Sequence, residues 1–145
     1  MTKKIKKISS SAKPKETSLI AKIENLCDGL FYISETDAVI VPFTGEKTEA
    51  VNGGVVLRQT GTAGDTPVEE VDFDVFFDRL TRIQDWFGER ETKRAKKFGE
   101  LKKLLAENLS ELKVFKVGRI RLDIYVVGLD RDGRLAGVKT KAVET

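Results

Sequence analysis

The chain has 145 residues, of which 40% are hydrophobic and 34% are charged, so it is long enough to bury the core of one domain without disulfides. The absence of histidine excludes Ser-His-Asp and Cys-His nucleophilic sites and imidazole-bound zinc, and Cys27 alone forms no internal disulfide. Any metal that the chain binds must therefore be a hard ion held by oxygen ligands, such as magnesium or calcium.

Charge divides the chain into two parts. Residues 1–17 hold six of the 26 basic and one of the 23 acidic side chains, which leaves 20 basic and 22 acidic side chains and a net charge of −2 for residues 18–145. We predict that residues 1–17 are a flexible basic tail and that residues 18–145 form one domain. The tail lacks an apolar run long enough for a signal peptide, and no stretch approaches the roughly 20 apolar residues of a membrane helix, which favours a cytoplasmic setting.

The first predicted helix begins at Thr17 or Ser18 and ends at Gly29, because apolar residues between them recur at helical spacing. The polar residues 34–37 are predicted to form a loop between this helix and a strand over residues 38–43, which a Thr-Gly turn closes. Residues 44–66 are rich in Gly, Thr, Asn and Asp and predict an exposed connection with one short strand at residues 55–59.

Asp72 is predicted to cap a short helix that carries Phe73, Phe76, Phe77 and Leu80. The acidic run around it is interpreted mainly as charge that favours a helix start, although it could also mimic a phosphate backbone toward a basic partner: Asp65, Glu69, Glu70, Asp72 and Asp74. Residues 81–88 then predict a linker, and residues 89–109 predict a long amphipathic helix.

The last third of the chain changes from helical to alternating periodicity. Ile120, Leu122, Ile124 and Val126 alternate with polar residues and Tyr125, which predicts a half-buried strand. An earlier strand at residues 112–117, a turn at residues 130–133 and a final strand at residues 135–143 complete a predicted antiparallel meander. Helices grouped around an antiparallel sheet indicate an α+β fold.

Three segments resemble the nuclease A inhibitor family: GLFYISETD at residues 29–37, DTPVEEVDFDVFF at residues 65–77, and the run from NLSELKVFKVGRIRLDIYVVG to LAGVKTKAVET at the end of the chain. The resemblance implies an α-β-α sandwich with an antiparallel sheet, similar to the pathogenesis-related plant proteins. It also implies a non-enzymatic, monomeric inhibitor that forms a 1:1 complex with a sugar-nonspecific nuclease and blocks its magnesium-containing active site.

The family's inhibitory residues match Glu35, Gln84, Trp86 and the terminal Thr145, and we add Glu144 to the expected partner-binding set. Glu35 and Thr145 are expected to reach the magnesium ion of the partner nuclease, whereas the chain carries no cofactor of its own. The match for Gln84 and Trp86 rests on Gln-x-Trp alone.

The residues by themselves leave other interpretations open. Trp86 beside Phe87 is also typical of core packing, and Glu35, Glu144 and Thr145 could be solvated surface groups. One alternative function is a nucleic-acid-binding module that uses the lysine-rich tail, although the mild acidity of residues 18–145 argues against it. A carboxylate-dependent metal enzyme that uses Glu35, Asp37 and the acids of residues 65–74 is the other, but these acids lack a recognisable ligand spacing.

Overall fold

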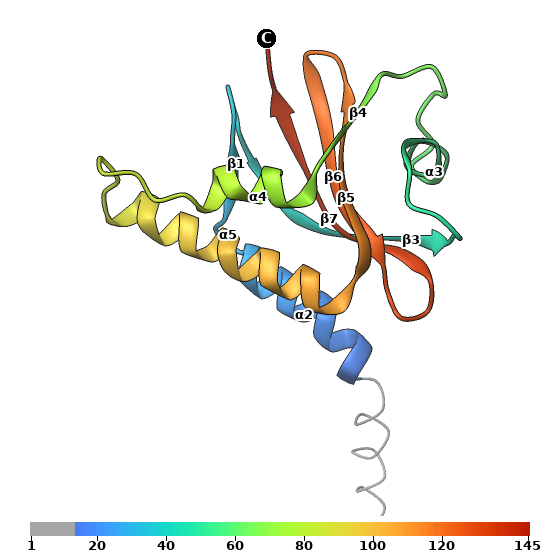
Figure 1. Ribbon diagram of the computed structural model, residues 1–145, viewed down its shortest axis with the longest axis horizontal. Helices are drawn as coiled ribbons and strands as arrows, with labels where there is room; N and C mark the ends of the chain where they lie inside the picture. The colour runs from blue at the N-terminus through green and yellow to red at the C-terminus, as the bar shows by residue number, and fades with distance from the viewer. Residues whose placement is uncertain (1–13) are drawn as a thin grey trace, which may run out of the picture.

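A five-stranded antiparallel sheet is the centre of the computed structural model, which describes residues 14–145 (Figure 1). The fold is mixed α+β, and a separate two-stranded sheet accompanies the large one. The helices are α2 (Pro14–Cys27), α3 (Gly53–Gln59), α4 (Phe73–Thr81) and α5 (Glu89–Asn108), and the strands are β1 (Phe31–Ile33), β2 (Asp37–Val39), β3 (Val41–Lys47), β4 (Val68–Val71), β5 (Ser110–Gly118), β6 (Arg121–Leu129) and β7 (Arg134–Val143).

The strand order in the large sheet is β3-β7-β6-β5-β4, so the predicted meander β5-β6-β7 forms its middle. Both outer strands come from earlier parts of the chain, and β3 pairs antiparallel with β7. The turn between β6 and β7 uses Asp130, whose carboxylate accepts hydrogen bonds from the backbone of Asp132 and Arg134, and Gly133 adopts a positive φ of 81°. The meander and its turn are therefore confirmed.

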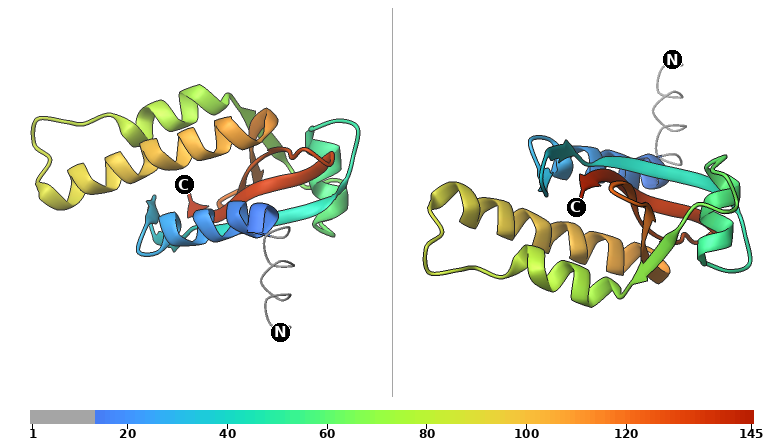
Figure 2. Two further views of the ribbon diagram at one scale, coloured as in Figure 1. Left: turned by 90° about the horizontal axis from the view of Figure 1, so that it is seen from below. Right: turned by 90° about the horizontal axis from the view of Figure 1, so that it is seen from above.

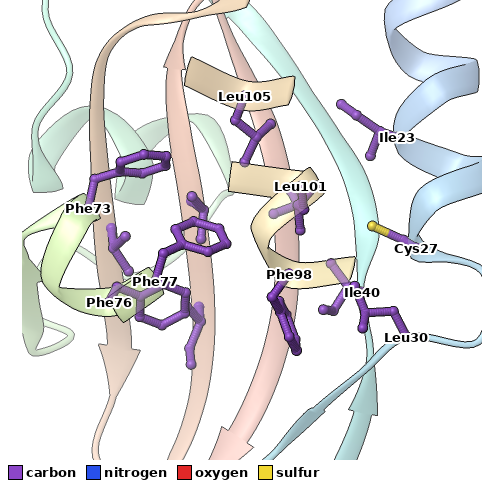
Figure 3. Close-up of a cluster of buried hydrophobic side chains, with 14 of the residues drawn as sticks. Ile23, Cys27, Leu30, Ile40, Phe73, Phe76, Phe77, Phe98, Leu101 and Leu105 are labelled. Atoms are coloured by element: carbon purple, nitrogen blue, oxygen red, sulfur yellow. The ribbon is translucent and has the colours of Figure 1, made fainter. Parts of the chain in front are cut away.

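Three helices cover one face of the sheet. Residues from α2, α4 and α5 join the β5, β6 and β7 side chains of that face in the larger core cluster, and Figure 3 shows Phe77, Leu101 and Leu105 at its centre. Cys27 belongs to this cluster, and burial raises the pKa of its thiol to about 11, although Lys97 opposes the shift. The prediction of an unreactive core thiol is consistent with this position.

The opposite face of the sheet carries a second, smaller core. Short helix α3 contributes Val55, Val56 and Leu57, which pack with Phe115, Tyr125 and other residues of the sheet. Figure 2 shows α3 at the end of the molecule away from the loop between α4 and α5. Because α3 and Phe43 of β3 cover Tyr125, strand β6 is buried on both faces there, not on one as its alternation predicted.

Helices α4 and α5 confirm their sequence signals. The Asp72 carboxylate accepts a hydrogen bond from the Val75 backbone N–H at 3.0 Å, which satisfies one of the free donors at the start of α4. Helix α5 spans Glu89–Asn108 and buries its apolar face as predicted: Ala95, Phe98, Leu101 and Leu105.

Three predictions for the region before α4 are wrong. Residues 55–59 lie in α3, because the Asn52 side chain accepts a hydrogen bond from Val55 N–H and caps a helix where the Asn-Gly-Gly run predicted a turn. The polar residues 34–36 join β1 to β2 and do not connect a helix to a strand. Glu69 and Glu70 lie on the edge strand β4, where charged side chains discourage pairing with other chains, so only part of the acidic run serves the start of α4.

Other differences concern element ends. Helix α2 already includes Pro14, four residues before Ser18. Ile120 lies in the β5–β6 turn and is 54% exposed. The prediction of a flexible tail falls mainly on residues 1–13, which lie outside the described residues. Within residues 14–145, none of the helices is long and apolar enough to cross a membrane.

Candidate functional site

The β1–β2 hairpin presents Glu35 at its tip. Backbone N–H of Ser34 donates to the Thr36 carbonyl at 2.8 Å, and the Ser34 hydroxyl donates to the same oxygen at 3.2 Å. These two bonds close a tight turn, because they hold the residues on either side of Glu35 together. The Glu35 side chain is consequently exposed on a short loop with a defined backbone conformation.

The end of β7 lies against this hairpin tip, as Figure 1 shows. Backbone N–H of Val143 donates to the Ser34 hydroxyl at 3.0 Å, and Glu35 N–H donates to the Val143 carbonyl at 3.3 Å. The backbone N–H and the hydroxyl of Thr145 both donate to Glu35 Oε2, each at 2.8 Å. The structure therefore brings Glu35 and Thr145, which are 110 residues apart, into direct contact.

Glu144 anchors the end of β7 to β5 and to the β5–β6 turn. Its backbone N–H donates to the Ile120 carbonyl at 2.9 Å, and its carboxylate accepts from Lys116 Nζ at 3.0 and 3.3 Å. Only 15% of the Lys116 side chain is exposed, so this ion pair is better shielded from solvent than an ordinary surface pair. Glu144 and Thr145 are thus bonded to different neighbours, Glu144 to the β5–β6 turn and to Lys116, and Thr145 to the hairpin.

The surroundings of Glu35 favour its ionised form. Hydrogen bonds from the backbone N–H of Thr145, and then from its hydroxyl, hold the pKa of Glu35 below its ordinary value of 4.5. Since both groups donate to the carboxylate, they stabilise its ionised form. The second carboxylate oxygen, Oε1, accepts no hydrogen bond from any side chain or backbone group within the described part of the chain.

We expect the contact between Glu35 and Thr145 to be lost only in acid. A lowered pKa in the folded state means that the contact is fully formed above pH 4.5 and weakens as the pH falls through the lower folded value. The amide proton shift of Thr145, followed by NMR, should titrate with a midpoint below 4.5, and Glu35→Gln should abolish that step. A midpoint at or above 4.5 would contradict the hydrogen-bonded arrangement.

Gln84 and Trp86 lie on a separate projection, the loop between α4 and α5 (Figures 1 and 2). The Gln84 carbonyl accepts a hydrogen bond from Phe87 N–H at 3.1 Å, so these residues form a turn. Trp86 is 73% exposed and meets the Phe87 ring edge to face at 4.7 Å between centroids. The interpretation of Trp86 as a core residue is therefore wrong, and its indole is available to a partner.

Within residues 14–145, no three acidic or cysteine side chains gather closely enough to hold a metal ion. Glu35 and Asp37 lie on the β1–β2 hairpin, whereas the acids of residues 65–74 belong to β4, α4 and the turn before them. What the site can offer is a pair of neighbouring oxygen groups, from Glu35 and Thr145, at one edge of the fold.

Sequence reasoning missed the residues that hold the terminal segment. Ser34 lies next to Glu35 in the Ser-Glu loop, so its position was a usable signal. No sequence signal pointed to Lys116 or Ile120, because their contacts with Glu144 depend on the pairing of β5, β6 and β7.

Comparison with known proteins identifies the family to which the chain belongs. A search of curated proteins finds no match to the chain. The sequence profile of a family described as nuclease A inhibitor-like protein matches residues 17–145, which is nearly the whole of the described structure and includes both the hairpin and the end of β7. The chain therefore belongs to the nuclease A inhibitor-like protein family.

Proposed function

We propose that this protein inhibits a sugar-nonspecific nuclease by inserting Thr145 and Glu35 into the metal-containing active site of that enzyme. The observation that carries the proposal is the contact of Thr145 with Glu35 through two hydrogen bonds of 2.8 Å on an exposed edge. Membership of an inhibitor family supplies the class of partner.

The chemistry of the nuclease active site favours an inhibitor that offers oxygen ligands. A magnesium-dependent nuclease holds phosphate oxygens around a hard cation, so a protein competitor needs oxygen ligands. In a chain that ends at Thr145, this residue carries both a carboxylate and a hydroxyl. Because the hydroxyl gives its proton to Glu35, the lone pairs of its oxygen are free to face a cation.

Preorganisation makes the proposal energetically reasonable. Chain ends usually fray, and an inhibitor that had to order its terminus on binding would lose affinity. Here the last three residues are already bonded to the hairpin on one side and to Ile120 and Lys116 on the other. In this scheme Glu144 contributes as the anchor of the terminus, through its ion pair with Lys116.

Trp86 and Gln84 are proposed to make a second contact with the nuclease, beside the active site. Exposed tryptophans that become buried in an interface often dominate its binding energy. The indole of Trp86 is already oriented by Phe87, so little side-chain entropy would be lost on binding.

The remaining parts of the proposal extend the family resemblance and the composition of the chain. We propose that the protein acts as a monomeric, non-enzymatic inhibitor in a 1:1 complex with magnesium supplied by the nuclease, and, from the lack of an apolar run long enough for a signal peptide, that it does so in the cytoplasm. We also infer an α-β-α sandwich similar to the pathogenesis-related plant proteins. The presence of helices on both faces of the five-stranded sheet supports that assignment.

A nuclease-protection assay against a panel of magnesium-dependent, sugar-nonspecific nucleases tests the function. We expect inhibition of at least one enzyme, with a half-inhibiting concentration that rises with nuclease concentration at fixed DNA. It should also rise as DNA exceeds its KM, because inhibitor and DNA compete for one active site. A half-inhibiting concentration that does not depend on the nuclease concentration would instead indicate that the protein sequesters the substrate, as the tail-based nucleic-acid module predicts. No inhibition of any member of the panel would refute the proposal.

A further inference from the structure

A groove of about 840 Å³ opens between the β1–β2 hairpin and the first half of α5. One wall is apolar and is formed by Leu30, Phe31 and Ile33, of which Phe31 and Ile33 are 40% and 46% exposed. The other wall is the α5 surface, which presents five cations: Arg90, Lys93, Arg94, Lys96 and Lys97. The groove therefore combines an uncovered aromatic ring with a strongly basic helix.

The groove is basic although residues 18–145 are acidic as a whole. Asp37 and Glu100 are the acids that line it, which leaves a net charge of +3 for the groove. Lys97 donates a hydrogen bond to the Asp28 carbonyl, whereas the other four cations have no carboxylate within 4.0 Å in the described part of the chain. Glu91 is close by, but its carboxylate accepts from Gly88 N–H at the start of α5.

This arrangement costs the helix stability. Arg90 and Arg94, like Lys93 and Lys97, are pairs of like charge four residues apart, which repel one another on a helix surface. Cations in the first turns of a helix also oppose its dipole. Glu89 and Glu100, four residues from Lys93 and Lys96, and Glu91, which interacts electrostatically with Arg94 and Arg90, offset part of this repulsion. The face of α5 that lines the groove nevertheless keeps an excess of positive charge, which suits an anionic ligand.

We propose that the groove binds a single strand of nucleic acid, with its phosphates on the α5 cations and a base stacked on Phe31. Cations at positions 90, 93 or 94 and 97 recur about once per helical turn, or about every 5.4 Å, so they can follow a backbone along the helix. Positive grooves with exposed aromatic rings are the general device for single strands. An acidic polypeptide would use the cations but gains less from an aromatic face. This inference goes beyond the proposed nuclease inhibition and does not depend on it.

Fluorescence anisotropy with a labelled 12-nucleotide oligothymidine and the full-length protein tests the proposal. We expect the double charge reversal Arg90→Glu/Arg94→Glu to weaken binding at least tenfold. The matched control Lys22→Glu/Lys103→Glu makes the same change in charge outside the groove and should weaken binding less than threefold. For three or four neutralised phosphates, the logarithm of the binding constant should fall with the logarithm of salt at a slope of about −2 to −3.

Two further variants separate the groove from other sources of binding. In a full-length, tail-neutralised background with all six lysines of residues 1–17 changed to Gln, the effect of the Arg90/Arg94 reversal should persist. Phe31→Leu should cost about fivefold or more with oligothymidine and nothing with an abasic strand, because only bases stack. Circular dichroism checks folding, and Arg90→Gln/Arg94→Gln replaces the reversal if α5 is perturbed.

Equal binding by the parent and the Arg90/Arg94 variant in the tail-neutralised background would overturn the proposal. Tighter binding of a polyglutamate with the same number of charges would overturn it too, in favour of an acidic protein ligand. Nuclease inhibition is measured on the same variants. Loss of strand binding with unchanged inhibition concerns the groove alone, and loss of inhibition with unchanged strand binding concerns the proposed inhibitor function alone, so the two proposals can fail separately.

Discussion

Deletion of Thr145 is expected to weaken inhibition of the target nuclease by about 30-fold to a few thousand-fold. Removing one partner of a desolvated charged contact costs about 2–5 kcal/mol, and each 1.4 kcal/mol is a factor of about ten in affinity. The deletion removes both donors to Glu35 Oε2 and moves the terminal carboxylate to Glu144, whose side chain is bound to Lys116. The inhibition constant measures the effect.

Three matched variants identify the group responsible. A Gly-Gly extension after Thr145 keeps its contact with Glu35 but removes the carboxylate from that residue, so it should weaken inhibition about as much as the deletion. The same two residues added before Met1 should change nothing, and Thr145→Ala, which removes the hydroxyl alone, should have a smaller effect. The melting temperature should be unchanged, because Thr145 is exposed and outside both cores. Full inhibition by the extended chain would exclude a direct role for the terminal carboxylate.

Substitution of Trp86 by alanine is expected to weaken inhibition by about 30-fold, which corresponds to about 2 kcal/mol for an anchoring tryptophan at an interface. The indole is 73% exposed, so its removal takes little from the free protein. The free energy of unfolding should therefore change by less than about 0.5 kcal/mol, as for other surface substitutions. Inhibition constants and urea unfolding of the same samples measure the two quantities.

Val75→Ala is the control for Trp86→Ala. Val75 is also an exposed apolar residue, at 56% exposure, but it lies on α4 and not on the loop between α4 and α5. We expect its truncation to leave the inhibition constant within about twofold. Trp86→Phe should retain part of the affinity, since it keeps an aromatic ring. A loss in Val75→Ala equal to that in Trp86→Ala would argue against a specific anchor on the loop.

The prediction for Thr145 depends on one feature of the fold, the way the last residues are held. Four hydrogen bonds join Val143 and Thr145 to Ser34 and Glu35, and the Glu144 ion pair with Lys116 lies on the other side. A substitution of Lys116 that removes its ion pair with Glu144, and leaves Glu35 and Thr145 unchanged, should therefore weaken inhibition less than deletion of Thr145. Such a variant adds only the entropic cost of ordering the terminus on binding.

Local signals in the sequence were sufficient for several elements. The Asp72 cap, the apolar stripe of α5 and the turn at residues 130–133 all depend on contacts within a few residues, and all three are confirmed. Residues 55–59 predict a strand because Val55, Val56 and Leu57 form a consecutive apolar run, but they belong to helix α3. Burial of this run depends on a second core on the far face of the sheet, which no local pattern records.

Sequence patterns and the family resemblance predict the α+β fold class and name Glu35, Trp86 and Thr145 as candidate residues. The contact between Glu35 and Thr145, the exposure of Trp86 on another loop, and the position of the α5 cations opposite an apolar hairpin appear only in the folded chain. The physical reason is distance along the chain. Contacts between residues 110 apart are set by the register of β7 in the sheet and by the packing of the helices, whereas periodicity and capping report only on neighbours.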